Sequence, residues 1–209
     1  MDVVFSTGYW LPVACFSVFR AGDTCIIEQY EHYQKQTNRT RCSICGANGP
    51  QTLVVPVIRK HGEKTFIKDV MLDLSKDWQR VHWLAIVSAY SSSPYFEYYQ
   101  DDIRPFYELK GPMSLFDYNR EILSCCFRLL ELDVTVSETG SYMSSYPGHD
   151  YRMIMPSYEP KPYYQIFARK HGFVPGQSIL DLILNEGPEA WKYLESETEP
   201  DRKQHFQIG

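Results

Sequence analysis

The beginning of the chain predicts a strand, a helix and a second strand in close succession. Residues 3–5 are a short apolar run, and residues 12–20 repeat apolar side chains at the spacing of one helix face. Gly22 follows that pattern as a helix terminator, and residues 25–27 form a second apolar run. This order is typical of a β-α-β unit.

A β-ribbon is predicted over residues 38–74, where polar and apolar side chains alternate along three segments. The pair Asn48-Gly49 is a strong hairpin signal, because both positions of such a turn favour positive φ. Residues 52–58 would form the return strand, and residues 66–74 alternate again as a third strand. We therefore expect an antiparallel insertion after the β-α-β unit.

The rest of the chain is predicted to be mainly helical. The expected helices cover residues 77–90, 94–108, 114–132 and 179–185, with a short one ending near residue 194. The first of them is apolar nearly all round, which predicts burial. We expect a short strand at residues 134–136 and a polar loop at residues 137–150.

Together these elements predict an α/β (or α+β) fold, a layered mixed sheet with flanking helices and an inserted antiparallel β-ribbon. We expect residues 1–194 to form a single domain, and residues 195–209 to be a flexible charged tail.

Charge and composition narrow the choice of partners. The net charge is −5, and the basic residues are scattered, so nucleic acid and anionic membranes are poor partners. No apolar run approaches the roughly 20 residues of a membrane span, and we expect no membrane insertion. The first residues lack a signal-peptide pattern, which predicts a cytoplasmic protein. Homo-oligomerisation is left open.

The six cysteines favour the same compartment, because a leaderless chain of this size does not need disulfides. Cys42 and Cys45 form the one CxxC pair, but a structural zinc site needs a second pair of ligands. On a strand the two side chains would also point to opposite faces. We expect buried thiols, and neither a metal nor a cofactor.

Arg39 and Arg41 are the first candidate binding pair. On one strand face they would lie about 7 Å apart, close enough to hold one phosphate or carboxylate from two directions. The alternative is a pair of exposed arginines bridged to Asp69 or Asp73 on the neighbouring ribbon strand.

Glu28, Tyr30 and His32 are the second candidate group. They share a face if the second strand continues, and that strand ends where open α/β sheets bind ligands. A histidine beside a carboxylate can serve as a general base. The alternative is a surface loop with a half-buried histidine. His82, within an apolar helix, is expected to be a hydrogen-bonded core residue.

Several stretches resemble the WbqC-like protein family, in its Bacteroides-type branch. They are residues 9–19 (YWLPVACFSVF), 28–41 ending in NRTR, 47–57 (ANGPQTLVVPV) and 164–187, with residues 78–90 and 93–99 between them. The family's polar segment maps onto Lys35, Asn38, Arg39 and Arg41. Its C-terminal signature maps onto Tyr163 or Tyr164, Gln165, Ser178 and Asp181. Many relatives carry a histidine before the Tyr-Phe-Pro motif, where this chain has Ser6-Thr7-Gly8.

The resemblance implies a transferase of bacterial surface-polysaccharide (O-antigen-type) biosynthesis, which would transfer an acyl or aminoacyl group to an amino-sugar intermediate. His32 and Glu28 would be catalytic. Residues that would bind a small-molecule or nucleotide-sugar ligand are Tyr30, Lys35, Asn38, Arg39, Arg41, Gln165 and Asp181. The alternative function is a non-catalytic ligand-binding or scaffold protein of the same pathway.

Overall fold

The computed structural model describes residues 2–22, 24–58, 64–156 and 161–194. Its main sheet has four parallel strands in the order β7-β2-β1-β8. The strands are β1 (Asp2–Ser6), β2 (Thr24–Glu28), β7 (Thr135–Glu138) and β8 (His149–Asp150). Helix α1 (Val13–Ala21) connects β1 to β2, which confirms the predicted β-α-β unit.

The two outer strands correct the prediction of a loop at residues 137–150. The end of β7 and the whole of β8 lie within that segment, and both pair in parallel with the central strands. β7 is exposed along its length and β8 has two residues. Strands this polar and this short lack the apolar alternation by which a strand is recognised.

The predicted ribbon is present in two pieces. β3 (Arg41–Gly46) pairs antiparallel with β4 (Gly49–Val54), and β5 (Val57–Ile58) with β6 (Met71–Leu72). Much of the expected third strand is instead the short 3-10 helix η1 (Ile67–Asp69). The hairpin turn is shifted by one residue, because Gly46 pairs with Gly49 and only Gly49 has a positive φ, of 99°.

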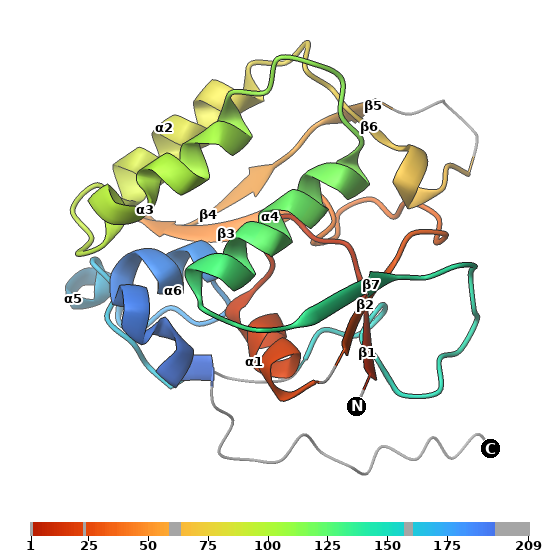
Figure 1. The fold of residues 1–209 in the computed structure, drawn as a ribbon. Coiled ribbons are helices and arrows are strands. Elements are labelled where there is room, and N and C mark those ends of the chain that lie inside the picture. Colours follow the sequence, from red (N-terminus) through yellow and green to blue (C-terminus); the bar gives the residue numbers. More distant parts are fainter. Residues whose placement is uncertain (1, 23, 59–63, 157–160, 195–209) are drawn as a thin grey trace.

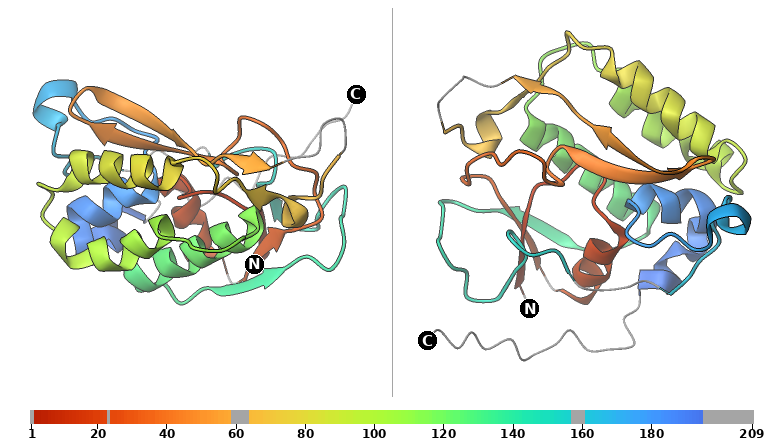
Figure 2. Two further views of the ribbon diagram at one scale, coloured as in Figure 1. Left: turned by 90° about the horizontal axis from the view of Figure 1, so that it is seen from above. Right: turned by 180° about the vertical axis from the view of Figure 1, so that it is seen from behind.

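Helices flank the sheet and the ribbon (Figure 1), and the described ones include none long and apolar enough to cross a membrane. They are α2 (Trp78–Tyr90), α3 (Phe96–Ile103), η2 (Arg104–Tyr107), α4 (Leu115–Leu129), α5 (Ala168–His171), α6 (Ile179–Glu186) and η3 (Gly187–Leu194). Seen from above, the β3–β4 hairpin runs along one side of the molecule and α4 and β7 along the other (Figure 2). The result is the mixed α/β fold that the pattern predicts.

Helix α2 is more exposed than its composition predicts. Val81 and Leu84 are each 51% exposed, while Trp78, His82 and Ile86 are buried. The helix contacts β3, η2 and α6, and the apolar side chains on its remaining surface face solvent.

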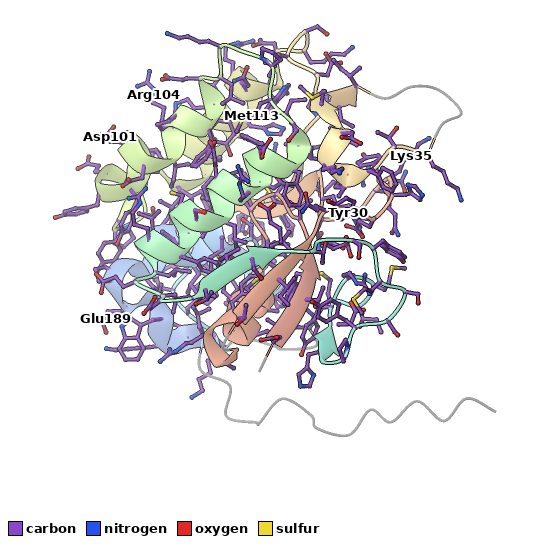
Figure 3. The ribbon with its side chains drawn as sticks, turned by 45° about the vertical axis from the view of Figure 1, so that its right-hand side comes forward. Tyr30, Lys35, Asp101, Arg104, Met113 and Glu189 are labelled. Carbon is purple, nitrogen blue, oxygen red and sulfur yellow. The ribbon has the colours of Figure 1, made fainter. Side chains whose placement is uncertain are left out.

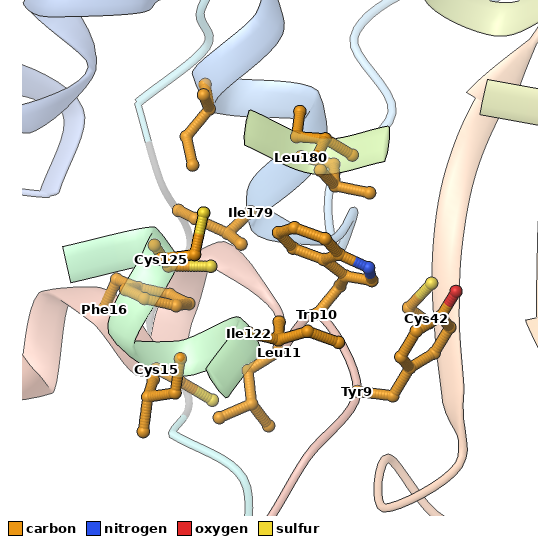
Figure 4. Packing of buried hydrophobic residues seen from close by; sticks show 14 of the residues in the cluster. Tyr9, Trp10, Leu11, Cys15, Phe16, Cys42, Ile122, Cys125, Ile179 and Leu180 are labelled. Atoms are coloured by element: carbon orange, nitrogen blue, oxygen red, sulfur yellow. The ribbon is translucent and has the colours of Figure 1, made fainter. Parts of the chain in front are cut away.

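One hydrophobic core joins the sheet, the ribbon and the helices. Trp10 lies in it beside Leu180 of α6, and Tyr9 lies beside Cys42 of β3 (Figure 4). All six cysteines are free and buried, and burial raises the pKa of the Cys25 thiol to about 12. Thiols in this state are inert small hydrophobic groups.

His82 is a core residue, as predicted, and belongs to a directed hydrogen-bond chain. The Trp10 indole N–H donates to the Tyr107 hydroxyl at 2.9 Å. That hydroxyl lies 2.9 Å from the Tyr9 hydroxyl, which lies 3.0 Å from Nδ1 of His82. Burial lowers the pKa of His82 to about 4, so the ring is neutral and Nδ1 can accept the Tyr9 proton. The Tyr9-Trp10 pair is therefore structural.

Candidate functional site

Charged and hydroxyl side chains gather at the carboxyl edge of the parallel sheet. Ser6 ends β1, Glu28 ends β2 and Asp150 ends β8. Ser6 is directly opposite Glu28, and Asp150 is opposite Val4 in the same sheet. Since parallel strands end at a common edge, residues from distant parts of the sequence meet there. Open α/β folds bind their ligands at this edge.

The first buried ion pair at this edge joins Arg39 to Glu31. Arg39 Nε donates to Glu31 Oε1 at 2.8 Å, and Nη2 donates to Oε2 at 2.5 Å. Nη2 also donates to Ser6 Oγ at 2.7 Å, and Nη1 to Thr37 Oγ1 at 3.2 Å. Four of the five N–H groups that a guanidinium carries are therefore engaged within the protein.

At the second position Arg152 forms ion pairs with both Glu28 and Asp150. Arg152 Nη1 donates to Glu28 Oε2 at 3.0 Å, and Nη2 donates to Asp150 Oδ2 at 2.5 Å. Glu28 is fully buried, and its other oxygen accepts from the Thr139 hydroxyl at 2.8 Å and the Tyr30 N–H at 2.7 Å. Both oxygens of Glu28 thus have protein donors.

Asp150 and Arg152 shift each other's pKa. Burial alone would raise the pKa of Asp150, but the hydrogen bonds from Arg152 hold it below its ordinary value. The same bonds raise the pKa of Arg152, against the effect of its burial. Both groups are therefore charged at neutral pH.

Ser6 connects the two ion pairs. Its Oγ lies 3.0 Å from Glu31 Oε2 and 3.1 Å from the Arg152 carbonyl oxygen. We call the connected set the sheet-edge network; its members are Ser6, Glu28, Glu31, Arg39, Thr139, Asp150 and Arg152. It fastens the segments after β2, β7 and β8 to the ends of the central strands.

A partly exposed rim is formed by the segment that follows β2 and by residues 66–68 at η1. Lys68 Nζ is 4.0 Å from the centre of the Tyr30 ring, and the His32 ring stacks on Phe66 with centroids 4.9 Å apart. His32 and Phe66 also form an antiparallel bridge, which fixes this segment against η1. Figure 3 shows Tyr30 and Lys35 at this end of the molecule. We call Tyr30, His32, Lys35, Phe66 and Lys68 the rim.

The structure separates Glu28 from His32. β2 stops at Glu28, so the face that residues 28, 30 and 32 were expected to share does not continue. The carboxylate of Glu28 is bonded to Arg152, Thr139 and Tyr30, and His32 is exposed and stacked on Phe66. The expectation that Glu28 orients the His32 ring is corrected accordingly.

Arg39 and Arg41 also have different surroundings. Arg39 is buried against Glu31, and neither Asp69 nor Asp73 is among its partners. Arg41 begins β3, is half-buried, and has no ion pair within the described part of the chain. Asn38 contributes its carbonyl oxygen, which accepts from the Tyr9 N–H at 2.9 Å. Arg39 is placed to position loops rather than to clamp an anion.

Gln165 and Asp181 come together, but away from the sheet edge. Asp181 on α6 accepts from Gln165 Nε2 and the Tyr163 hydroxyl, both at 2.7 Å, and from the Tyr90 hydroxyl at 2.9 Å. Burial raises the pKa of Asp181. The cluster attaches α6 to the end of α2, and Figure 1 places α6 on the opposite side of the molecule from the ends of β1 and β2.

The sequence did not predict five members of the sheet-edge network, namely Ser6, Glu31, Thr139, Asp150 and Arg152. Ser6 and Glu31 each lie near the end of a predicted strand, and that position could have marked them. Arg152 had no such signal, because β8 was hidden in a polar loop. Within residues 2–22, 24–58, 64–156 and 161–194, no three His, Cys, Asp or Glu side chains form a cluster that could hold a metal ion.

Comparison with known proteins gives one family and one relative. The model of the WbqC-like protein family matches residues 9–156. A protein of Mycobacterium tuberculosis named Uncharacterized protein Rv1507c is 25% identical, in an alignment that covers 86% of this chain and 90% of that protein. No solved structure matches the chain.

Proposed function

The chain belongs to the WbqC-like protein family, and we propose that it is a transferase of bacterial surface-polysaccharide assembly with its site at the carboxyl edge of the sheet. Family membership confirms the resemblance seen in the sequence, while the Bacteroides-type branch stays a prediction. The observation that carries the proposal is the sheet-edge network, two buried ion pairs beside a rim whose His32 and Lys35 are exposed and whose Tyr30 and Lys68 are half-buried.

Each layer of the site has its own role in this proposal. Arg39 and Arg152 position the loops, because most of their N–H groups are bonded to protein oxygens. Lys68 and Lys35 would hold the phosphates of a nucleotide sugar. The Tyr30 ring would contact the sugar face.

The proposed reaction is acyl transfer to an amino sugar. As the amine nitrogen forms a bond to the acyl carbon of an activated acyl donor, the bond from that carbon to its leaving group breaks. His32 would take the proton that the amine releases. His32 is exposed on the rim, where a ligand can reach it.

Binding of UDP-N-acetylglucosamine, measured by titration calorimetry, tests the location of the site. Lys68→Gln should weaken binding about fivefold to tenfold, the loss of one charge contact to phosphate. Lys110→Gln is the control, because Lys110 is an exposed lysine between η2 and α4 and is not a member of the rim. Equal affinities of the two variants would contradict the proposed site.

The alternative is a non-catalytic ligand-binding protein of the same pathway, and the separation of His32 from Glu28 favours it. His32→Gln distinguishes the two functions. In a deletion strain, a transferase with this substitution should fail to restore surface polysaccharide although the purified variant still binds the ligand. A binding protein should restore it fully.

A further inference from the structure

Five exposed residues form an apolar patch beside the sheet-edge network. Met153 is 75% exposed and Ile154 is 60% exposed, and Tyr142, Met143 and Met155 are exposed as well. We call these five residues the methionine patch. Scattered apolar side chains are normal on a protein surface, but a group of this size beside a candidate site indicates a contact surface.

Arg152 holds the two halves of the patch together. Its Nη1 donates to the Met143 carbonyl at 2.7 Å, and its guanidinium lies 5.5 Å from the centre of the Tyr142 ring. Met153 follows it in the chain and contacts Gln34 Nε2 through sulfur at 3.8 Å. The buried arginine therefore presents apolar side chains from two loops next to the rim.

The charge around the patch has the opposite sign to that of the whole chain. Segments 28–40, 64–69 and 139–156 carry five basic residues (Lys35, Arg39, Lys64, Lys68, Arg152) and four acidic ones (Glu28, Glu31, Asp69, Asp150), a net of +1, on a chain of net −5. Glu28, Glu31 and Asp150 are paired with arginines. Lys35 and Lys64 face solvent, and Lys68 lies against the Tyr30 ring. Asp69 is the one acidic residue of these segments that is not paired with an arginine.

We propose that the methionine patch, with Lys35, Lys64 and Lys68, docks the protein on the surface of an anionic lipid bilayer. This local surface departs from the expectation, drawn from the net charge of the whole chain, that anionic membranes are poor partners. The apolar side chains would enter the boundary between headgroups and acyl chains, and the lysines would contact lipid phosphates. A second copy of the chain fits less well, because a twofold contact through this patch would place lysines against lysines. If the proposed function holds, the acceptor sugar would be carried by a lipid and would reach the rim along the membrane surface.

Co-sedimentation with vesicles, performed without sugar ligand, tests the docking alone. The protein should bind vesicles of phosphatidylcholine containing phosphatidylglycerol, bind pure phosphatidylcholine much less, and dissociate as salt rises. Met153→Ala with Ile154→Ala should weaken binding at least about tenfold, because the loss of two inserted methylene groups is already enough for an effect of this size. Lys64→Gln should weaken it about fivefold, the contribution of one lysine near an anionic leaflet.

The matched controls are Val81→Ala with Leu84→Ala, an equally exposed apolar pair on α2, and Lys110→Gln. Neither control should change vesicle binding. The docking is refuted if the protein ignores anionic vesicles, or if patch and control variants bind them equally. It is also refuted if the patch variant dissociates an oligomer, seen by light scattering, without losing vesicle binding. A failure here with intact binding of UDP-N-acetylglucosamine would leave the proposed function standing.

Discussion

Replacing Arg152 with methionine should destabilise the protein strongly, because it leaves a buried carboxylate without its cation. Glu28 is fully buried, and Arg152 Nη1 is its charged partner at 3.0 Å. After the substitution the donors that Glu28 would retain among the described residues are the Thr139 hydroxyl and the Tyr30 N–H. Breaking one side of a buried ion pair costs about 3–5 kcal/mol. That is a large part of the roughly 5–15 kcal/mol by which a domain is stable.

The same reasoning predicts that neutralising Glu28 restores much of the loss. In the double variant Arg152→Met with Glu28→Gln, the uncompensated charge is gone, and the amide oxygen of the new side chain can still accept a hydrogen bond from Thr139. The double variant should therefore be more stable than the sum of the single effects predicts, by about 2 kcal/mol. Asp150 keeps its own charge in every variant, but it is partly solvated and tolerates the loss better.

Urea unfolding followed by circular dichroism gives the free energies for this cycle. Arg128→Met is the matched control, because Arg128 pairs with Asp102 at 2.7 Å on the surface, where such pairs contribute about 0–1 kcal/mol. The reasoning is refuted if Arg152→Met costs no more than Arg128→Met. Strict additivity of the two single substitutions would refute it as well, since it would mean that Glu28 and Arg152 do not interact energetically.

Two further predictions concern buried titratable groups away from the sheet edge. Burial lowers the pKa of His82 to about 4, so as pH falls the unfolded chain takes up this proton before the folded protein does. The free energy of unfolding should therefore fall by about 3 kcal/mol between pH 6.5 and pH 4. Urea unfolding of His82→Gln should show a smaller decrease over the same pH range. Asp181→Ala should lower the free energy of unfolding by about 3 kcal/mol, because three donors lose their acceptor. Asp181→Asn should lower it less. Because burial raises the pKa of Asp181 and penalises its charged form, the difference in stability between Asp181→Asn and the parent protein should shift in favour of the variant as pH rises.

Local patterns were sufficient to predict the first strand, the helix after it and the β3–β4 hairpin. Each depends on residues that are neighbours in the sequence, such as the apolar run at residues 3–5 and the glycine at the turn. The turn itself was misplaced by one residue, because the pairing of Gly46 with Gly49 decides which positions form the bend. β7 confirms the predicted strand at residues 134–136 in part, whereas β8, with two polar residues, has no apolar periodicity by which it could be recognised.

The candidate site was only partly predictable, for a reason visible at Glu28. The alternation of residues 28, 30 and 32 assumed a continuing strand, yet the Glu28 carboxylate accepts the Tyr30 N–H at 2.7 Å and turns the chain there. A side chain that bonds the backbone two residues later competes with strand pairing. The partner of Glu28 is Arg152, 124 positions away, and only the parallel topology brings it near. The sequence pattern located the edge, while the pairing depends on the whole fold.

The sheet-edge network buries charged groups, and the loss of their hydration offsets much of the stability that their ion pairs contribute. Stability alone therefore does not explain this network, and its geometry has to be considered. Apolar side chains of similar volume often replace buried ion pairs with no loss of stability. Apolar packing, however, does not fix loops in one arrangement as tightly as directed bonds to guanidinium groups do. Arg39 ties Thr37 and Glu31 to Ser6, and Arg152 ties the Met143 carbonyl to Glu28. Both arginines therefore constrain segments that carry exposed side chains, which is the arrangement expected where a rigid base must hold a solvent-facing site in place.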